Sequence, residues 1–558
     1  MVQRVLQFFY GEIRGLHKAA YILALFTFGS QLLALLRDRL LAHSFGASLE
    51  LDLYYAAFRI PDLLFVLFAS VLSVYVLLPF VTRARAESGS QAGASVLRQM
   101  FTLFVLFYTV FAAALFVFAP YVLPYLLPGL TGDLDTLVTL TRILLLQPFL
   151  LGLSSLFGVV TQLESRFTLY AVSPLLYNLG IIAGIILFYP TLGLNGLVWG
   201  VVVGALAHLL IQLPVWLRSP LRFGLTANFS KPLLFEVAKV ALPRALTLSI
   251  HQIVLLVLVG MATLMAAGSV SVFQFAFNLQ SVPLAIIGMS YSVAAFPVLA
   301  DLLARGERVA FVKHLETAVR HIIFWALPVA ALIVVIRAQI VRVVLGSGEF
   351  SWNDTRLTAA LLAVFVVGLI GQALLLLLVR AFYAGGNTRI PLLVAVFSAA
   401  GTVGLSFFLL HLYETMPRIG EVLSRLLRLE GVNGVEILVL GLAFTSGVLI
   451  ELLILGSLIG RHFAVSWRPV LKPLLTAFLA SVVAGLSAYV TLNFVVVGIN
   501  QETFVGIFIQ GLVAGVVGVI GAGLTYAALG SSELNEVFKS LKAKLSRAEV
   551  LAPQTDAP

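Results

Sequence analysis

The stretch LLRDRLLAHSFGASLELDLYYAAFRIPDLL, residues 35–64, places seven charged side chains among Leu, Phe and Ala. The whole chain of 558 residues is apolar, with 61% hydrophobic and 11% charged residues and a mean hydropathy of +1.06. A soluble core cannot absorb that much apolar surface, so the composition predicts an integral membrane protein. The charges in residues 35–64 then need a specific explanation.

Apolar runs long enough to cross about 30 Å of hydrocarbon recur along the chain. They are continuous rather than alternating, which favours helices over strands. We expect an all-α polytopic membrane protein with about 14 transmembrane helices. Their approximate limits are 19–41, 53–81, 101–127, 137–162, 168–189, 192–217, 240–267, 270–303, 319–345, 356–384, 390–412, 436–460, 470–495 and 503–529.

The basic residues predict the orientation. Of the 35 Lys and Arg, roughly 23 lie in segments that face the cytoplasm if the N-terminus does, and about 6 lie in outer loops. Both termini are therefore expected in the cytoplasm, in a multi-pass membrane protein. The net charge of +10 indicates contact with anionic membrane lipids rather than with nucleic acid.

Internal similarity predicts a repeat of six helices. SVYVLLPFVTRARAESG around Pro79 resembles SVAAFPVLADLLARGE around Pro297, about 218 positions later. PLLYNLGIIAG at Pro174 resembles PLLVAVFSAAG at Pro391, about 217 positions later. GLNG also returns as GVNG, displaced further by a long outer loop. A near-constant offset indicates two copies of one unit, related by an axis along the membrane normal.

This repeat predicts two six-helix lobes followed by two C-terminal helices. The expected parts are a basic amphipathic segment at 1–18, an N-terminal lobe at 19–230, a C-terminal lobe at 231–462, helices 13 and 14 at 463–530, and a cytoplasmic tail at 531–558. Residues 1–18 lack a small-residue cleavage site, so the first span is expected to stay as an anchor.

Two lobes around a central cleft are typical of transporters, and we expect a V-shaped cavity with the substrate site near mid-membrane. The sequence contains no recognisable catalytic triad, metal motif or phosphate-binding Gly loop, so we expect no enzyme activity, cofactor or metal. His208 and His251 lie in predicted spans and are interpreted as hydrogen-bonded helix contacts rather than proton relays.

Arg59 is the strongest candidate for a functional charge. It lies inside the second predicted span, one turn before Asp62 and close to Pro61, which should bend the helix and serve as a hinge. A charge at that depth usually faces a water-filled cavity or a partner. Two alternatives stay open: Arg59 pairs with Asp62, or it extends to the membrane surface. Arg37 and its neighbours close the first span and could be interfacial anchors.

The same residues carry a family resemblance. Residues 35–70 resemble the first helical hairpin of the MurJ/MviN lipid II flippases, in which an RD pair is followed by FG, by an Asp and by an AF(K/R)-P element. Similar pieces occur at SPLLYNLGIIAG (173–184), GSGEFSWNDT (346–355) and AFYAGGNTRIP (381–391). The resemblance covers most of residues 20–460 in the right order.

The resemblance implies a flippase of a bacterial inner membrane. It would move lipid II, the lipid-linked peptidoglycan precursor, from the cytoplasmic to the outer leaflet by alternating access, and so would serve cell wall biogenesis and cell shape. The substrate is a polyprenyl-pyrophosphate-linked glycan, and Arg suits its pyrophosphate because the guanidinium pairs two phosphate oxygens. Arg37, Asp52 and Arg59 match polar positions of the family hairpin. Helices 13 and 14 would hold the lipid tail. We expect a monomer.

The chain also departs from the family pattern. Gln31, Phe65 and Ser70 stand where relatives usually carry charged residues in the hairpin, and Asn278 stands where an Arg usually follows in the eighth span. The seventh and eleventh spans lack the carboxylates with which some relatives bind a cation. Sodium coupling by that route is therefore not expected.

The predicted cavity is asymmetric in charge. We expect Arg37 and Arg59 to face water in the N-terminal lobe, with Gln31 replacing part of a lost contact. The C-terminal lobe is expected to contribute the uncharged groups Gln252, Asn278 and Gln280.

Three other functions stay open. They are a flippase for another polyprenyl-linked oligosaccharide, a multidrug or toxin extruder of the same fold, and a scaffold that transports nothing. An extruder should show a buried Asp or Glu to exchange for cations, and the acid-poor span interiors argue against it.

Overall fold

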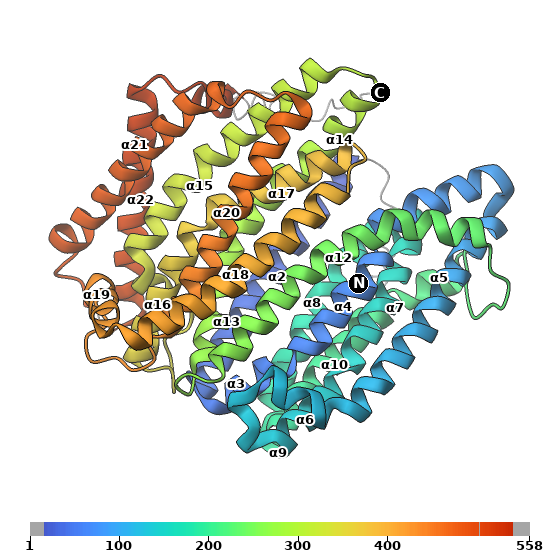
Figure 1. Cartoon of the computed structure of the whole chain (residues 1–558), viewed down its shortest axis with the longest axis horizontal. Helices are drawn as coiled ribbons and strands as arrows, with labels where there is room; N and C mark the ends of the chain where they lie inside the picture. The colour runs from blue at the N-terminus through green and yellow to red at the C-terminus, as the bar shows by residue number, and fades with distance from the viewer. Residues whose placement is uncertain (1–15, 501–502, 540–558) are drawn as a thin grey trace, which may run out of the picture. The chain divides into compact units, whose positions relative to one another are not determined.

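The computed structural model describes residues 16–500 and 503–539, so most of the predicted segment 1–18 and of the tail 531–558 lies outside the described residues. The described residues are mostly helical and contain no strand (Figure 1). This confirms the predicted all-α membrane fold. The chain forms two compact units, each discontinuous in sequence, whose boundaries fall inside α13, α15, α16 and α20.

Unit 1 comprises the described residues up to Phe275 together with Val344–Thr358 and Thr388–Ala443. Its elements are α2 (Leu16–Phe45), α3 (Leu49–Ala57), α4 (Arg59–Val71), α5 (Val74–Leu126), η1 (Pro128–Asp133), α6 (Leu134–Leu144), α7 (Leu146–Leu163), α8 (Phe167–Ala183), η2 (Gly184–Phe188), α9 (Tyr189–Leu192), α10 (Leu194–Leu210), α11 (Leu213–Arg218), α12 (Lys231–Ala262), the start of α13 (Ser269–Leu284), α18 (Arg389–Thr415) and α19 (Pro417–Leu427).

Unit 2 comprises Ala276–Val343, Ala359–Asn387 and the described residues from Phe444 onward. Its elements are the end of α13, η3 (Ala285–Met289), α14 (Ser290–Ala304), α15 (Arg308–Val344), most of α16 (Trp352–Val367), α17 (Leu369–Ala384), most of α20 (Ile437–Phe463), α21 (Arg468–Val490), η4 (Thr491–Val495), α22 (Phe504–Ala528) and a last helical segment at 532–539. Within it α21 packs along α22, and α14 packs against α17.

Every predicted span falls on helix, but the count of spans differs from fourteen. Among the described residues, 11 helical runs are long and apolar enough to cross a membrane, and the pair α16–α17, bent by 43°, brings the number to 12. Two predicted spans lie within the single run Leu49–Leu126, and α2 is not among the 11. Within α5, the backbone is non-helical at Ser88 and Gly89, where φ of Gly89 is +79°.

The second predicted span is broken rather than continuous. α3 ends before Phe58, α4 begins at Arg59, and Pro61 lies in the first turn of α4. Pro61 has no N–H to donate to the carbonyl of Ala57, and its ring would collide with that carbonyl in a straight helix. The interruption at Phe58 agrees with this lost hydrogen bond, but Phe58 keeps right-handed helical backbone angles, so a bend at Pro61 stays a prediction. Movement about this hinge stays a prediction.

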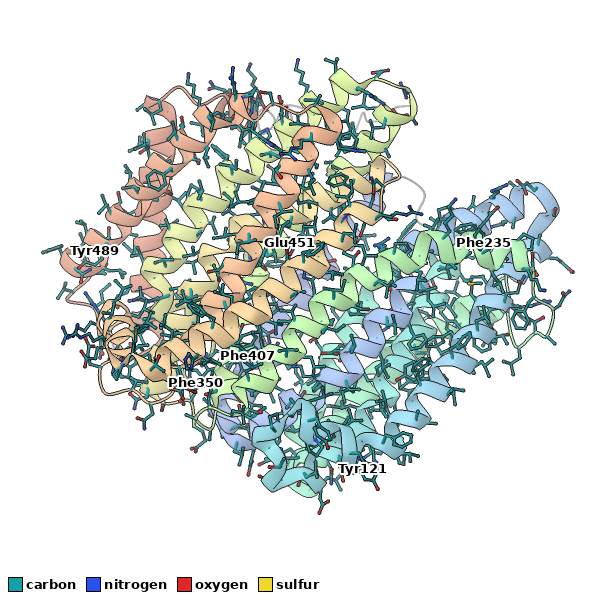
Figure 2. All side chains as sticks on the ribbon, viewed as in Figure 1. Tyr121, Phe235, Phe350, Phe407, Glu451 and Tyr489 are labelled. Carbon is teal, nitrogen blue, oxygen red and sulfur yellow. The ribbon has the colours of Figure 1, made fainter. Side chains whose placement is uncertain are left out.

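Glycines explain the tightest helix contact in unit 1, between α8 and α10. A Cβ added at Gly180 would overlap the backbone of Gly204, and one at Gly200 would overlap the backbone of Gly184. Within a membrane, helices associate through such close backbone approach because lipid provides no hydrophobic driving force. By contrast, Tyr121 and Phe407 are more than half exposed, as expected for side chains that face lipid (Figure 2).

Candidate functional site

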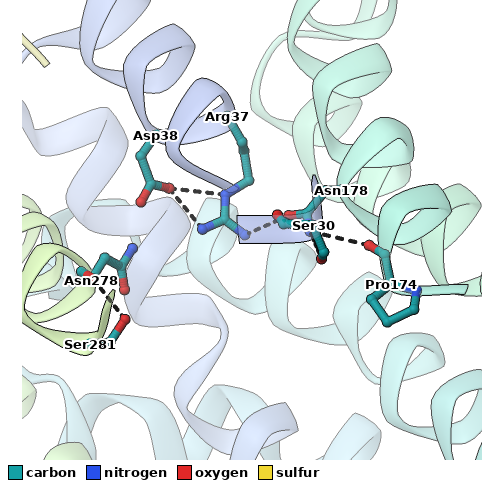
Figure 3. Close-up of polar contacts among 7 residues, drawn as sticks. All are labelled: Ser30, Arg37, Asp38, Pro174, Asn178, Asn278 and Ser281. Atoms are coloured by element: carbon teal, nitrogen blue, oxygen red, sulfur yellow. Dashed lines mark hydrogen bonds and ion pairs between the residues drawn. The ribbon is translucent and has the colours of Figure 1, made fainter. Parts of the chain in front are cut away.

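Arg37 is held in a network of hydrogen bonds between α2 and α8. Its guanidinium donates to the Asp38 carboxylate at 2.8 and 2.9 Å and to Oδ1 of Asn178 at 3.3 Å (Figure 3). The Asn178 amide donates in turn to Ser30 Oγ at 3.2 Å and to the Pro174 carbonyl at 3.1 Å. The Arg37 side chain keeps 21% of its surface exposed, whereas Asp38 is buried. Arg37 is therefore fixed in position while part of it stays open to solvent or ligand.

Arg59 is more deeply buried, with 7% of its surface exposed, so the expectation that it faces water is wrong. One terminal nitrogen donates to Oε1 of Gln274 on α13, and the buried Nε has no hydrogen-bond partner. No ion pair joins Arg59 to Asp62 within the part of the chain that the structure describes, although the two charges are within electrostatic range. A buried N–H without a partner costs free energy that a ligand oxygen would recover.

Tyr55 lies near both arginines. It lies within electrostatic range of both Arg37 and Arg59, and its buried hydroxyl has no hydrogen-bond partner. Tyr177 of α8 lies within the same range of Arg37 and Asp62. We call Arg37, Tyr55, Arg59, Asp62 and Tyr177 the arginine cluster. It combines two guanidinium groups with unused donors, a combination suited to an anionic group such as phosphate.

Asp52 has a different environment. Its carboxylate accepts hydrogen bonds from the backbone N–H groups of Gly268 and Ser271, both at 2.7 Å, and from the Ser271 hydroxyl at 2.6 Å. These groups belong to the first turn of α13, so Asp52 of α3 caps that helix. Its oxygens are occupied in this conformation, and Asp52 as a substrate ligand stays a prediction.

The remaining predicted residues lie apart from these contacts. Gln31 is half-buried on α2, and Gln252 is half-buried on α12, which packs against α4. Asn278 belongs to unit 2, where its carbonyl accepts from the Ser281 hydroxyl at 2.7 Å. The expectation that Gln280 faces water is wrong, because its side chain is fully buried and exchanges hydrogen bonds with Gln372 at 3.2 Å.

His208 confirms its predicted role as a helix contact, since Nδ1 lies 2.7 Å from the Ser154 hydroxyl. No group of three or more His, Asp or Glu in the described residues could hold a metal ion.

The family profile described as "Lipid II flippase MurJ" matches residues 41–504. This chain belongs to the MurJ lipid II flippase family. The Burkholderia cenocepacia "Lipid II flippase MurJ" is 26% identical over 395 residues, covering 68% of this chain and 76% of that protein. The predicted membership is therefore confirmed.

Solved structures agree with the fold of the MurJ family. The structure titled "Lipid II flippase MurJ, inward closed conformation" matches with a TM-score of 0.71 at 20% identity, over 91% of this chain and 99% of that chain. An inward-facing MATE multidrug transporter of the MOP superfamily matches with a TM-score of 0.61 at 16% identity, over 77% and 95% of the two chains. At these identities the likeness concerns the fold alone.

Asn178 and Gln274 are contacts of the arginines that sequence reasoning missed. Asn178 lies inside SPLLYNLGIIAG, one of the stretches that resemble the MurJ family, and it is the polar residue of an otherwise apolar run. That isolation was a usable signal. Gln274 was not isolated in this way, because Asn278 and Gln280 follow it along α13.

Proposed function

We propose that this chain is a lipid II flippase of the bacterial inner membrane, which moves the lipid-linked peptidoglycan precursor from the cytoplasmic to the outer leaflet by alternating access. The observation that carries this proposal is the profile match over residues 41–504, which includes α3, α4 and most of the arginine cluster. Both termini would lie in the cytoplasm, and the protein would act as a monomer without chemical change to its substrate.

The arginine cluster would bind the pyrophosphate. Arg37 is already oriented by Asp38 and Asn178, so little side-chain entropy remains to be lost when a phosphate oxygen binds. Arg59 offers its unpartnered Nε, and Tyr55 offers its hydroxyl. A charge-assisted hydrogen bond of this kind is worth about 1.5–3 kcal/mol. Asp38 and Asp62 offset part of the positive charge, which would keep the ligand from binding too tightly to be released.

The predicted contributions of Gln31, Gln252 and Asn278 belong to the same proposal as uncharged hydrogen-bonding groups toward the glycan or phosphate. α21 and α22 would accommodate the polyprenyl tail, because many of their large apolar side chains are exposed.

Depletion of the protein in its own bacterium tests the proposal. We expect lipid II to accumulate on the cytoplasmic face, where an impermeant reagent applied outside does not reach it. Accumulation of a different polyprenyl-linked oligosaccharide, with normal lipid II, would favour the alternative glycan flippase. Unchanged lipid-linked precursors together with increased sensitivity to cationic drugs would favour an extruder.

A further inference from the structure

The loop between α18 and α20 contains an amphipathic helix with no assigned role. This helix, α19, runs from Pro417 to Leu427 with the sequence PRIGEVLSRLL. At 100° per residue, its Ile, Val and Leu side chains share one face, whereas Arg418, Glu421 and Arg425 share the opposite face. A separation this complete in 11 residues indicates a boundary between an apolar and a polar medium.

α19 is fixed at both ends. Pro417 begins the helix, where its missing N–H is not needed, and the Ile419 N–H donates to the Met416 carbonyl at 2.9 Å. At the other end, Leu429 N–H donates to the Ser424 carbonyl at 2.7 Å. The Arg356 side chain donates through Nε to the Arg428 carbonyl at 3.0 Å. These contacts lie within unit 1, so the helix has a defined place there.

The apolar face is only partly covered by protein, because Ile419, Leu423 and Leu427 are half-buried whereas Val422 and Leu426 are exposed. Val422 is 62% exposed and Leu426 is 73% exposed, and no residue of α19 is buried. Met416, directly before the helix, is 53% exposed. A pair of large apolar side chains held this openly on a fixed helix needs another medium to cover it.

The adjacent span identifies that medium. α18 is apolar and long enough to cross a membrane, and only Met416 separates its last residue from α19. Phe407 (Figure 2) and Phe408, in the last third of α18, are each 59% exposed, as expected of side chains that face lipid. Tyr413 follows them and packs on Gly420 of α19. Tyrosine is one of the residues that gather at membrane surfaces. The exposed apolar side chains of α19 thus follow those of α18 directly along the chain.

The charges of this loop cancel. Residues 414–430 contain the arginines 418, 425 and 428 and the glutamates 414, 421 and 430. Arg425 lies 4.0 Å from Glu421, and Arg356 lies 3.9 Å from Glu430. Each basic residue near an anionic surface contributes only about 1 kcal/mol, and equal numbers of acids oppose it. Attraction to anionic head groups is therefore not what holds the helix.

We propose that α19 is an interfacial anchor that lies along the lipid surface beside the end of α18, with Val422 and Leu426 inserted among the lipids. It binds by apolar burial and does not depend on anionic lipid. It holds the surface end of α18 at a set depth in the bilayer.

Depth measurements on the full chain test this proposal. The natural sequence contains no cysteine, so Val422→Cys and Leu426→Cys can each carry a single spin label without other changes. Glu421→Cys and Arg425→Cys are the matched controls on the polar face of the same helix. All four positions are exposed, so the substitutions should leave folding intact. Each variant is placed, one copy per nanodisc, in phosphatidylcholine with or without phosphatidylglycerol.

We expect labels at 422 and 426 to be relaxed by oxygen and about fivefold less accessible to a water-soluble nickel complex than labels at 421 and 425. This difference in nickel accessibility between the two faces should be the same in both lipid compositions. Equal nickel access at all four positions would overturn the proposal, and so would a contrast that needs phosphatidylglycerol. A contrast that arises only when two copies share a disc would assign the face to a second protein molecule. None of these outcomes depends on flipping of lipid II.

Discussion

At the scale of single residues, Arg37 and Arg59 show two ways of keeping an arginine inside an apolar chain. Arg37 is compensated by Asp38 and oriented by Asn178, which lies 141 positions away in sequence. Arg59 is buried with a neutral partner, Gln274, and keeps an unused N–H. Burial of a charge without full compensation is costly, so a site that keeps it is a candidate for ligand binding.

Arg59→Ala should therefore lower flipping activity by about tenfold or more, the equivalent of one charge-assisted hydrogen bond. Gln31→Ala is the matched control, a half-buried polar residue of the adjacent α2 with no charge to lose. Its effect should be within about threefold, since a neutral hydrogen bond contributes about 0.5–1.5 kcal/mol. The measurement is rescue of a depleted strain by each variant at equal protein level. Full rescue by Arg59→Ala would remove the pyrophosphate-binding role of this arginine.

We expect substitution of Asp52 to lower the stability of the protein rather than to affect transport directly. Asp52→Asn removes the charge and one of the two oxygens that cap α13, and we expect the free energy of unfolding to fall by about 1–3 kcal/mol. Ser271→Ala removes a single bond to the same carboxylate and should cost about 0.5–1.5 kcal/mol. Thermal unfolding of the purified protein in detergent measures both. A variant Asp52→Asn that is inactive yet as stable as the natural protein would instead make Asp52 a substrate ligand.

At the scale of elements, the contact between α8 and α10 depends on the absence of side chains. Gly200→Ala places a methyl group against the backbone of Gly184, where no flexible side chain can move away. Overpacking of this kind typically costs about 1–3 kcal/mol. Gly404→Ala on α18 is the control, since its Cβ would meet open space. We expect a lower unfolding temperature for Gly200→Ala alone, and equal temperatures would show that α8 and α10 adjust easily.

The last described helix, 532–539, is attached to α15 by an ion pair and a histidine–carboxylate contact. Arg320 lies 3.0 Å from Glu533, and His321 lies 2.8 Å from Glu536. Burial acts to raise the pKa of Glu533, but hydrogen bonds from its own backbone N–H and from the Ser531 hydroxyl, together with the Arg320 charge, outweigh burial and lower that pKa below 4.5. Because the folded pKa of Glu533 is lowered, the contribution of Glu533 to this attachment is fully present above about pH 4.5 and is lost as the pH falls through the folded pKa.

Amide hydrogen exchange checks this attachment. Glu533→Gln should already loosen residues 532–539 at neutral pH, with exchange about tenfold faster, which corresponds to about 1.4 kcal/mol. Asn535→Ala, on the exposed side of the same helix, should leave exchange unchanged. If the Glu533→Gln protein exchanged at the natural rate, the helix would be held by its other contacts, including those of Glu536.

At the scale of the whole molecule, composition and hydropathy were sufficient to predict an all-α membrane fold, because the solvent that a chain requires is a property of its bulk composition. The interruption at Phe58 agrees with the position of Pro61, because the effect of proline on a helix is local. The residues around Arg37 and Arg59 carried the family resemblance. The lobe boundaries and the repeat stay predictions.

The contacts that define the candidate site could not be predicted in the same way. Arg59 meets Gln274 over 215 positions, and Asp52 caps Ser271 over 219 positions. Such pairings depend on how the helices pack, and a single sequence taken alone contains no pattern that predicts them. The prediction that Gln280 lines the cavity was wrong for the same reason. Its partner Gln372 lies 92 positions away in sequence.

The central claim is that this chain moves lipid II across a bilayer. The most direct measurement reconstitutes the purified protein in liposomes that contain fluorescent lipid II and follows its exposure to an impermeant quencher, with another polyprenyl-linked oligosaccharide as the parallel substrate. We predict that lipid II equilibrates between the leaflets faster than in empty liposomes and faster than the other glycan, and that Arg59→Ala slows this about tenfold. Lipid II that stays in its original leaflet, while the other glycan moves, would contradict the claim.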